Sequence, residues 1–184
     1  DLFTRVLYGG RVSLLIGLVA GIVGTGVGAV VGALAGFYGS WTDRLLMRLT
    51  DAAYSIPTLP LLIVLSSYTQ AAATSMALII GLLSWMATAR VVRGDVLIIK
   101  EIAYVEAARS LGFRNMRIIL RHIMPNVLGP IVVGATLAVG NAIILESSLS
   151  FLGLGVQPPI PTWGNMLMDA QATMATKPWL TIFP

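Results

Sequence analysis

The chain has little charge and no cysteine. Only 11% of its 184 residues are Asp, Glu, Lys or Arg, one is histidine, and 57% are hydrophobic, with a mean hydropathy of +0.86. Ordinary soluble domains carry about 25% charged residues, so this composition excludes a typical water-soluble fold. The absence of cysteine excludes disulfides and thiolate metal sites.

Long stretches contain no charge at all. Val12–Thr42 and Ala52–Ala89 lack Asp, Glu, Lys, Arg and His, and Val127–Ile160 is interrupted only by Glu146. A bilayer core about 30 Å thick needs roughly 20 apolar helical residues. We therefore expect an all-α fold, a polytopic transmembrane helical bundle with about four spans. The expected spans are Leu14–Tyr38, Ala52–Ser67, Met76–Val92 and Val127–Ser148.

The segments between these spans have their own signals. Gly39–Asp51 alternates leucines with charges and is expected as a short loop or a helix along the membrane surface. Pro57, near the start of the second span, either ends a surface helix or kinks a membrane helix. The polar patch Ser66–Ser75 is expected to be a short turn, and the Gly- and Pro-rich stretch Ser150–Pro161 a loop.

The first span is rich in glycine, and its last four glycines, Gly24, Gly28, Gly32 and Gly36, are spaced four apart. This spacing places them on one helix face, where a second helix can approach closely. The segment Gly24–Ala29 also matches a dinucleotide-binding pattern. We reject that interpretation, because the segment lies within an uncharged run without strand-turn-helix punctuation.

The charge that the chain does have is concentrated in Arg90–Pro125, which holds seven of the twelve basic residues. Such excess is typical of cytoplasmic loops of membrane proteins, so we interpret it as topology and expect no nucleic-acid partner. Ile102, Val105, Ala108 and Leu111 recur at helical spacing, and Gly112 stands where a helix would stop. A second short helix, 114–124, is expected to end where Pro125 starts the next span. It would present three arginines that determine topology and bind lipid phosphates: Arg114, Arg117 and Arg121.

Within this segment, Glu106-Ala107-Ala108, three further residues, Gly112 and then Pro125 resemble the EAA loop of binding-protein-dependent ABC importer permeases. The family pattern ends in Ile, any residue, Leu, Pro, where this sequence has His122-Ile123-Met124-Pro125. Two further stretches resemble the C-type permease of dipeptide, oligopeptide and nickel importers. They are Arg5–Leu14 and Leu149–Pro159 with Thr162-Trp163-Gly164.

The resemblance implies a partial type I importer transmembrane domain over residues 1–184, with a cytoplasmic coupling loop at about 90–125 and an outer loop at about 150–184. Such permeases commonly have six spans, so the first and last would lie outside this chain. It implies a multi-pass protein of the plasma (inner) membrane. The implied partners are a homologous second permease, two cytoplasmic ABC ATPase subunits and an extracytoplasmic substrate-binding protein. ATP and Mg would bind to the ATPases, so no cofactor and no metal are expected in this chain, which has no Walker A pattern.

The implied function is that of a transport subunit and not an enzyme: half of a translocation path for di- or oligopeptides, or alternatively for nickel. In the family, the EAA helix docks in a groove of the ATPase. The residues implied for this coupling are Glu106, Ala107, Ala108, Arg109 and Gly112. The alanines would allow close approach, Glu106 and Arg109 would pair across the interface, and Gly112 would permit a sharp exit.

Two other classes of membrane protein remain open as alternatives: an intramembrane enzyme, and a channel or scaffold. An intramembrane enzyme needs paired catalytic groups, but Glu146 is the one acidic residue in an expected span, and His122 lies at the opposite end of that helix. Glu146 is a candidate pathway residue because acids in spans are functional by default. A channel or scaffold packed through the glycine face would need no ATPase partner, so copurification with an ATPase distinguishes it.

Overall fold

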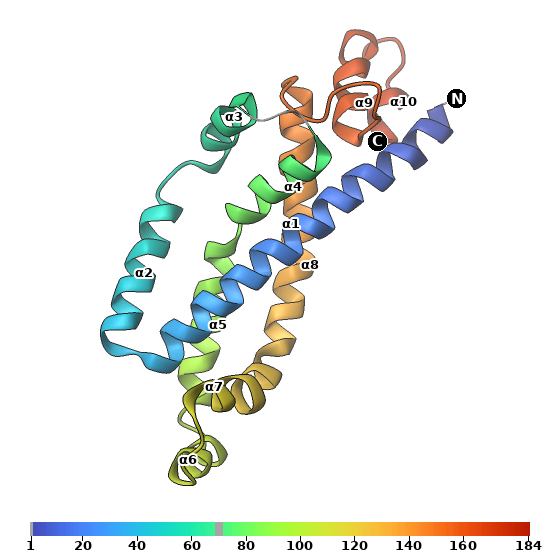
Figure 1. The fold of residues 1–184 in the computed structure, drawn as a ribbon. Coiled ribbons are helices and arrows are strands. Elements are labelled where there is room, and N and C mark those ends of the chain that lie inside the picture. The colour runs from blue at the N-terminus through green and yellow to red at the C-terminus, as the bar shows by residue number, and fades with distance from the viewer. Residues whose placement is uncertain (1, 69–71) are drawn as a thin grey trace. The chain divides into compact units, whose positions relative to one another are not determined.

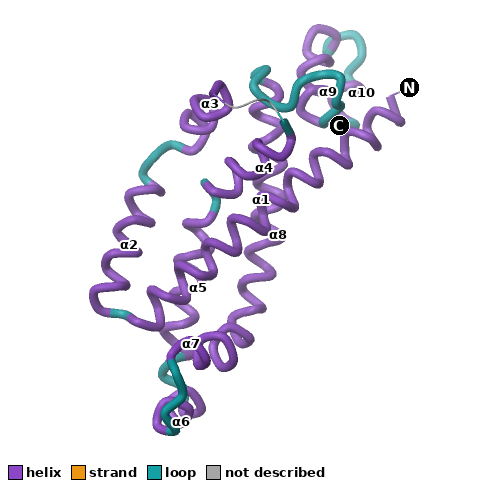
Figure 2. The backbone as a smooth tube through the Cα atoms, viewed as in Figure 1, coloured by secondary structure: helices purple, strands orange, loops and turns teal. Residues whose placement is uncertain are grey.

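The computed structural model describes residues 2–68 and 72–184, and the regular elements among them are helices (Figures 1 and 2). The all-α prediction is therefore confirmed for the described part of the chain. The elements are α1 (Leu2–Tyr38), α2 (Ser40–Tyr54), α3 (Thr58–Tyr68), α4 (Ala73–Leu82), α5 (Trp85–Ile99), α6 (Ala103–Ser110), α7 (Asn115–Ile118), the π-helix η1 (Ile119–Ile123), α8 (Met124–Phe151), α9 (Trp163–Ala170), the 3-10 helix η2 (Gln171–Thr173) and α10 (Trp179–Ile182).

Two continuous helices are long and apolar enough to cross a membrane: α1, and the helix Asn115–Phe151 formed by α7, η1 and α8. Two bent pairs pass the same test when each pair is taken together. These pairs are α2 with α3 and α4 with α5, each interrupted by a break of four residues or fewer. The described residues thus hold two candidate spans, or four if each bent pair is one span, which is the number expected from the sequence.

The second expected span, Ala52–Ser67, is wrong as a single helix. The structure ends α2 at Tyr54 and begins α3 at Thr58, after Pro57. Proline has no N–H and restricts the residue before it, so of the two effects considered for Pro57 the structure shows helix termination. The turn expected at Ser66–Ser75 is shorter than predicted, because helix occupies both its ends; residues 69–71 lie outside the described residues.

The third expected span is also broken. Helix α4 ends at Leu82, and α5 then continues to Ile99, seven residues beyond the predicted end at Val92. Arg90 and Arg93 therefore lie within a helix and not in a loop. Gly81 lies two residues before the break and Ser84 lies within it, a combination that favours bends and that the predicted span did not take into account.

The second short helix of the charged segment, expected at 114–124, is not separate. Helix α7 passes into η1 and then into α8 without interruption. Pro125 is the second residue of α8, and the π turn directly precedes it. Proline removes an intrahelical donor from the helix, and local π adjustments accommodate such losses. The three arginines that this segment was expected to present are exposed, and Ile118, Ile119 and Ile123 are buried on its other face.

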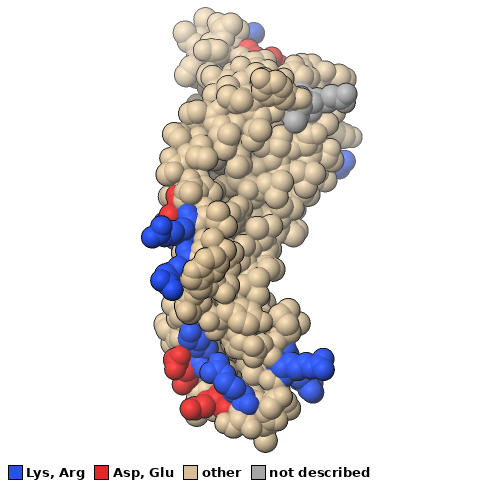
Figure 3. All heavy atoms as spheres, turned by 60° about the vertical axis from the view of Figure 1, so that its left-hand side comes forward, with Lys and Arg blue, Asp and Glu red and all other residues tan. Residues whose placement is uncertain are grey.

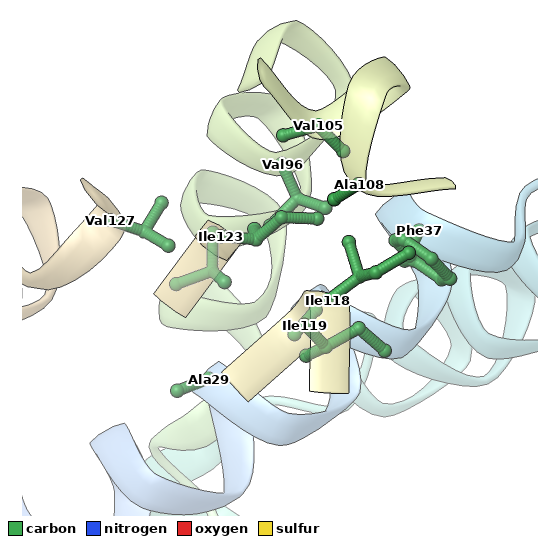
Figure 4. Close-up of a cluster of buried hydrophobic side chains, with 11 residues drawn as sticks. Ala29, Phe37, Val96, Val105, Ala108, Ile118, Ile119, Ile123 and Val127 are labelled. Carbon is green, nitrogen blue, oxygen red and sulfur yellow. The ribbon is translucent and has the colours of Figure 1, made fainter. Parts of the chain in front are cut away.

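The described chain forms two compact units, each with its own core. One contains residues 24–56 and 84–136 and the other contains residues 2–23, 57–83 and 137–184, with 69–71 left out of the description. In the core of the first unit, apolar side chains from α1, α5, α6, η1 and α8 point toward one another (Figure 4). The core of the second is built from Ile16, Leu62, Met76, Ile80 and Leu149 with smaller neighbours.

The glycine face of α1 packs against α5 inside the first unit, as close-packing reasoning predicts. A Cβ added at Gly28 would lie 2.5 Å from the Trp85 carbonyl oxygen, and one at Gly36 would lie 2.8 Å from Val96 Cβ. At Gly32 the added atom would meet the carbonyl oxygen of Ala89. The missing side chains are therefore required for this helix pair, and no nucleotide-type turn is formed there.

Candidate coupling site

Helix α6 is a short amphipathic helix whose two ends are defined by local geometry. It begins after Ile102, which has extended backbone (φ −76°, ψ 141°), and Glu106 lies in its first turn, where a negative charge is favourable. It ends in a Schellman motif: the N–H of Gly112 donates to the carbonyl of Arg109 (3.0 Å), and that of Phe113 donates to Ala108 (3.2 Å). Gly112 has a φ of +76°, which only glycine adopts without steric cost.

Only Val105 and Ala108 of α6 are buried, and they pack in the core with Phe37 and Ile118 (Figure 4). Glu106 and Ala107 are exposed, and Arg109 is exposed with its guanidinium 5.7 Å from the centre of the Phe37 ring. Of the four apolar residues found at helical spacing, Val105 and Ala108 are buried, whereas Ile102 and Leu111 are exposed, with exposed fractions of 41% and 75%. Gly112 turns the chain there before the helical period is completed. The helix is thus held by one narrow edge and presents the rest to its surroundings.

Charge on the face drawn in Figure 3 lies in a few separate groups on a largely uncharged surface. Within the part of the chain that the structure describes, Glu106 forms no ion pair. Arg114, Arg117 and Arg121 also lack an acidic partner there, although the Arg117 guanidinium lies 4.8 Å from the centre of the Phe113 ring. These side chains remain available to a partner or to lipid.

Three other basic residues of the charged segment, which the sequence reading assigned to topology, make specific contacts. Arg93 on α5 forms a bidentate ion pair with Asp43 on α2. Arg90, also on α5, donates to Asp51 Oδ1 on α2 (2.6 Å). The ammonium of Lys100 donates to the carbonyl of Gly36 (3.0 Å). Sequence reasoning missed these contacts. A signal for them was the spacing of Asp43 and Asp51, which are eight residues, or about two helical turns, apart and therefore share one helix face.

Glu146, the candidate pathway residue, is fully buried inside its own unit. Its carboxyl accepts hydrogen bonds from the hydroxyls of Ser13 (3.3 Å) and Ser150 (2.7 Å). The Ser13 hydroxyl oxygen in turn accepts from the backbone N–H of Trp163 (3.2 Å). The carboxyl therefore joins α1, α8 and the start of α9, and its assignment as a pathway residue remains a hypothesis.

The two sequence motifs that lie outside the charged segment, Arg5–Leu14 and Leu149–Pro159 with Thr162-Trp163-Gly164, pack against each other. A Cβ at Gly10 would lie 2.9 Å from the Trp163 ring, and one at Gly9 would lie 3.4 Å from the Thr162 backbone. The indole N–H of Trp163 donates to the carbonyl of Val6 (3.1 Å). The double glycine of the first motif thus makes room for the Thr-Trp-Gly of the second. Among the described residues, no group of three or more His, Cys, Asp or Glu side chains is arranged to hold a metal.

The Schellman motif allows a direct test of the end of α6. Gly112→Val should disrupt it, because a β-branched residue in the left-handed region costs about 1–2 kcal/mol, whereas Gly112→Asn should retain it, since asparagine tolerates this region. No atom would lie within 4 Å of an added Cβ at Gly112, so conformation alone decides the result. We expect amide hydrogen exchange at Gly112 and Phe113 to accelerate roughly 5- to 30-fold in the valine variant only. Equal protection in both variants would contradict this account.

The described residues form a helical membrane domain with a short, exposed, glycine-terminated helix between two candidate spans, as expected for a transport permease with a coupling helix. The comparison with protein families agrees: residues 28–183 match the model of the binding-protein-dependent transport system inner membrane component. The chain belongs to this family, and the resemblance predicted from its motifs is confirmed.

Individual relatives are similar to the whole chain. The chain is 42% identical over its full length to the glutathione transport system permease protein GsiD of Escherichia coli O6:K15:H31 and 40% identical to that of Pectobacterium atrosepticum. It spans 61% of the length of each of these relatives. Two solved structures of the MetNI methionine ABC transporter in inward-facing conformations share the fold. Each has a TM-score of 0.73, with 18% and 23% identity, and 97% and 98% of this chain matches 91% and 89% of theirs.

Proposed function

We propose that the chain is the membrane permease subunit of an ATP-driven importer and couples to its ATPases through α6. The observation that carries this proposal is the exposed tip formed by Glu106 and Ala107 on a helix that buries only Val105 and Ala108. This arrangement suits insertion of α6 into a groove. Ala107 permits close approach, and the unpaired carboxylate of Glu106 favours a partner surface of positive charge. Family membership supports the same reading.

The partners follow from that proposal. A homologous permease would complete the path, two cytoplasmic ATPase subunits would hold ATP and Mg, and an extracytoplasmic binding protein would deliver the cargo. We place the loop from Arg90 to Pro125 on the cytoplasmic side of the inner membrane, because it holds most of the basic residues. We place residues 150–184 outside. The described features of residues 1–184 suit one partial transmembrane domain of such a transporter.

For the cargo we propose small peptides, with glutathione, itself a tripeptide, as the first compound to test. The relatives that match the full chain are named glutathione transport system permease proteins, which favours this class over nickel. Uptake of labelled glutathione, a dipeptide and Ni²⁺ by the intact transporter, each in competition with the other two, will identify the cargo. Uptake of Ni²⁺ alone would overturn the peptide assignment.

Glu106→Lys should uncouple ATP hydrolysis from uptake. Reversing one charge in a docked interface costs several kcal/mol, so we expect uptake per ATP hydrolysed to fall about tenfold or more. The measurement is cargo uptake and phosphate release by the full transporter reconstituted in vesicles, with the amount of inserted permease determined by blotting.

Glu101→Lys is the matched control, because it makes the same charge change at an exposed residue that precedes α6. It should leave the ratio of uptake to hydrolysis near that of the wild type. If Glu106→Lys also leaves the ratio unchanged, the coupling role of α6 is wrong. If no ATPase copurifies with the wild-type permease, a channel or scaffold becomes the better interpretation.

A further inference from the structure

The single histidine of the chain lies in an unusual environment beside α6. His122 is part of the π-helix η1 and occupies the position where the family pattern has isoleucine. Its Nε2 atom is buried and has no hydrogen-bond partner among the described residues. A buried polar atom left unpaired destabilises the fold, so the presence of histidine here calls for a compensating contact.

That contact is aromatic. The imidazole of His122 stacks on the ring of Phe113, with ring centres 6.0 Å apart and planes inclined by 23°. The ring of Tyr104 is tilted by 40° to the imidazole of His122, with ring centres 6.5 Å apart. Tyr104 belongs to α6, and Phe113 is the residue that follows Gly112. We call Tyr104, Phe113 and His122 the aromatic joint.

The backbone of His122 is held as well. Its carbonyl oxygen accepts a hydrogen bond from the amide of Asn126 (2.7 Å) and a longer one from the hydroxyl of Tyr104 (3.4 Å). This carbonyl belongs to the π turn, three residues before Pro125. The π turn and the missing N–H of proline both interrupt the regular α-helical hydrogen bonds there. The joint therefore fastens α6 to the turn at which the long helix Asn115–Phe151 is irregular.

Helix α6 needs such a fastening. It has eight residues, of which Val105 and Ala108 alone are buried, and a helix this short is not stable without tertiary contacts. The two buried residues anchor only one side of α6, so by themselves they do not fix the rotation of the helix about its long axis. The rings of Tyr104 and Phe113, one near each end of α6, limit that rotation through His122.

We propose that His122 is a positioning residue: through the aromatic joint it sets the orientation in which α6 presents Glu106, and it transmits displacement of α6 to the π turn and thus to α8. This role in coupling rests on the proposed function. The positional part, in which His122 restrains α6, is testable without transport.

The first experiment measures the mobility of α6. These 184 residues contain no cysteine, so Leu111→Cys, in a transporter whose remaining segments and subunits have been freed of cysteine, provides a single site for a nitroxide, at a position whose exposed fraction is 75%. With the full transporter in lipid nanodiscs, His122→Ile should raise the ratio of mobile to immobile label about two- to tenfold, the range expected for loss of one aromatic pair. Tyr104→Phe, which removes only the longer hydrogen bond, should have a smaller effect.

The second experiment measures coupling. His122→Ile should lower the uptake of cargo per ATP hydrolysed by a similar factor, while insertion and copurification with the ATPases stay at wild-type levels. Met116→Ile is the matched control, because Met116 is exposed on the adjacent α7 and makes none of the joint contacts. If His122→Ile fails to insert, Phe113→Leu tests the same contact from its other side.

The outcomes separate the two proposals. Unchanged label mobility in His122→Ile, or in Phe113→Leu if that variant is needed, overturns the joint, whatever transport does. Raised mobility with an unchanged uptake ratio overturns its part in coupling. A wild-type transporter without ATP-coupled uptake overturns the proposed function, while the mobility measurement still decides whether His122 restrains α6.

Discussion

Gly32→Leu will prevent α1 from packing on α5 and will abolish accumulation of the folded permease. A Cβ at this position would lie 2.9 Å from Val92 Cβ and 3.0 Å from the backbone nitrogen of Arg93, and it would also meet the Ala89 carbonyl oxygen. Two of these three neighbours are backbone atoms, so the side chains of α5 have no room to adjust.

The effect will be large because helices in a membrane associate chiefly through close packing, without a hydrophobic driving force between them. Overpacking commonly costs about 1–3 kcal/mol, and the leucine adds three further carbons beyond the Cβ. We expect the temperature of half-denaturation in detergent to fall sharply and the protease-resistant fraction in membranes to be lost.

Gly26→Leu is the control, on the same helix and with the same change in volume. No atom lies within 4 Å of a Cβ added at Gly26, so this variant should accumulate like the wild type. If the two variants behave alike, the close approach of α1 to α5 does not determine stability, and the interpretation of the glycine spacing fails.

Glu146→Ala will be the second severe substitution. It leaves the buried hydroxyls of Ser13 and Ser150 without their shared acceptor and creates a cavity in the second unit. Unpaired buried polar groups and cavities together should cost about 2–4 kcal/mol. We expect proteolysis within residues 152–178 to become much faster, since the Trp163 N–H depends on Ser13 for its own partner.

Two variants sharpen this test. Glu146→Gln keeps the shape and one acceptor oxygen, so its protection should be intermediate. Ser148→Ala removes a hydroxyl from the same helix that bonds only to the carbonyl of Ile144 (2.8 Å), and it should change little. If Glu146→Ala folds normally but reduces uptake, the carboxyl acts in transport and not in holding residues 152–178.

The sequence predicted those features that depend on local pattern. Charge-free runs located the apolar helices, glycine spacing predicted the packing face of α1, and Gly112 ended α6 in the expected left-handed conformation. The exposed tip at Glu106 followed from a motif, and its geometry agrees with that reading. What these tip residues bind stays a prediction.

Tertiary relations were beyond such reasoning. The contacts of Arg93 with Asp43 and of Glu146 with Ser13 join residues 50 and 133 positions apart, and a single sequence gives no pairing between such distant groups. Arg93 therefore looked like a topology signal, and Glu146 looked like a candidate for the pathway. The contacts of His122 were not predicted either, because its partners, Tyr104 and Phe113, are brought to it by the turn at Gly112.

The Trp163 contacts also determine the order in which the protein can be completed. The backbone N–H of Trp163 reaches a residue 150 positions earlier, and its indole N–H reaches one 157 positions earlier. A ribosome makes Val6, Gly10 and Ser13 about 150 residues before it makes Trp163, so this part of α1 must wait without these partners while the intervening residues are synthesised. These contacts of α1 thus form late relative to the synthesis of α1 itself, after the whole of α8 has been made.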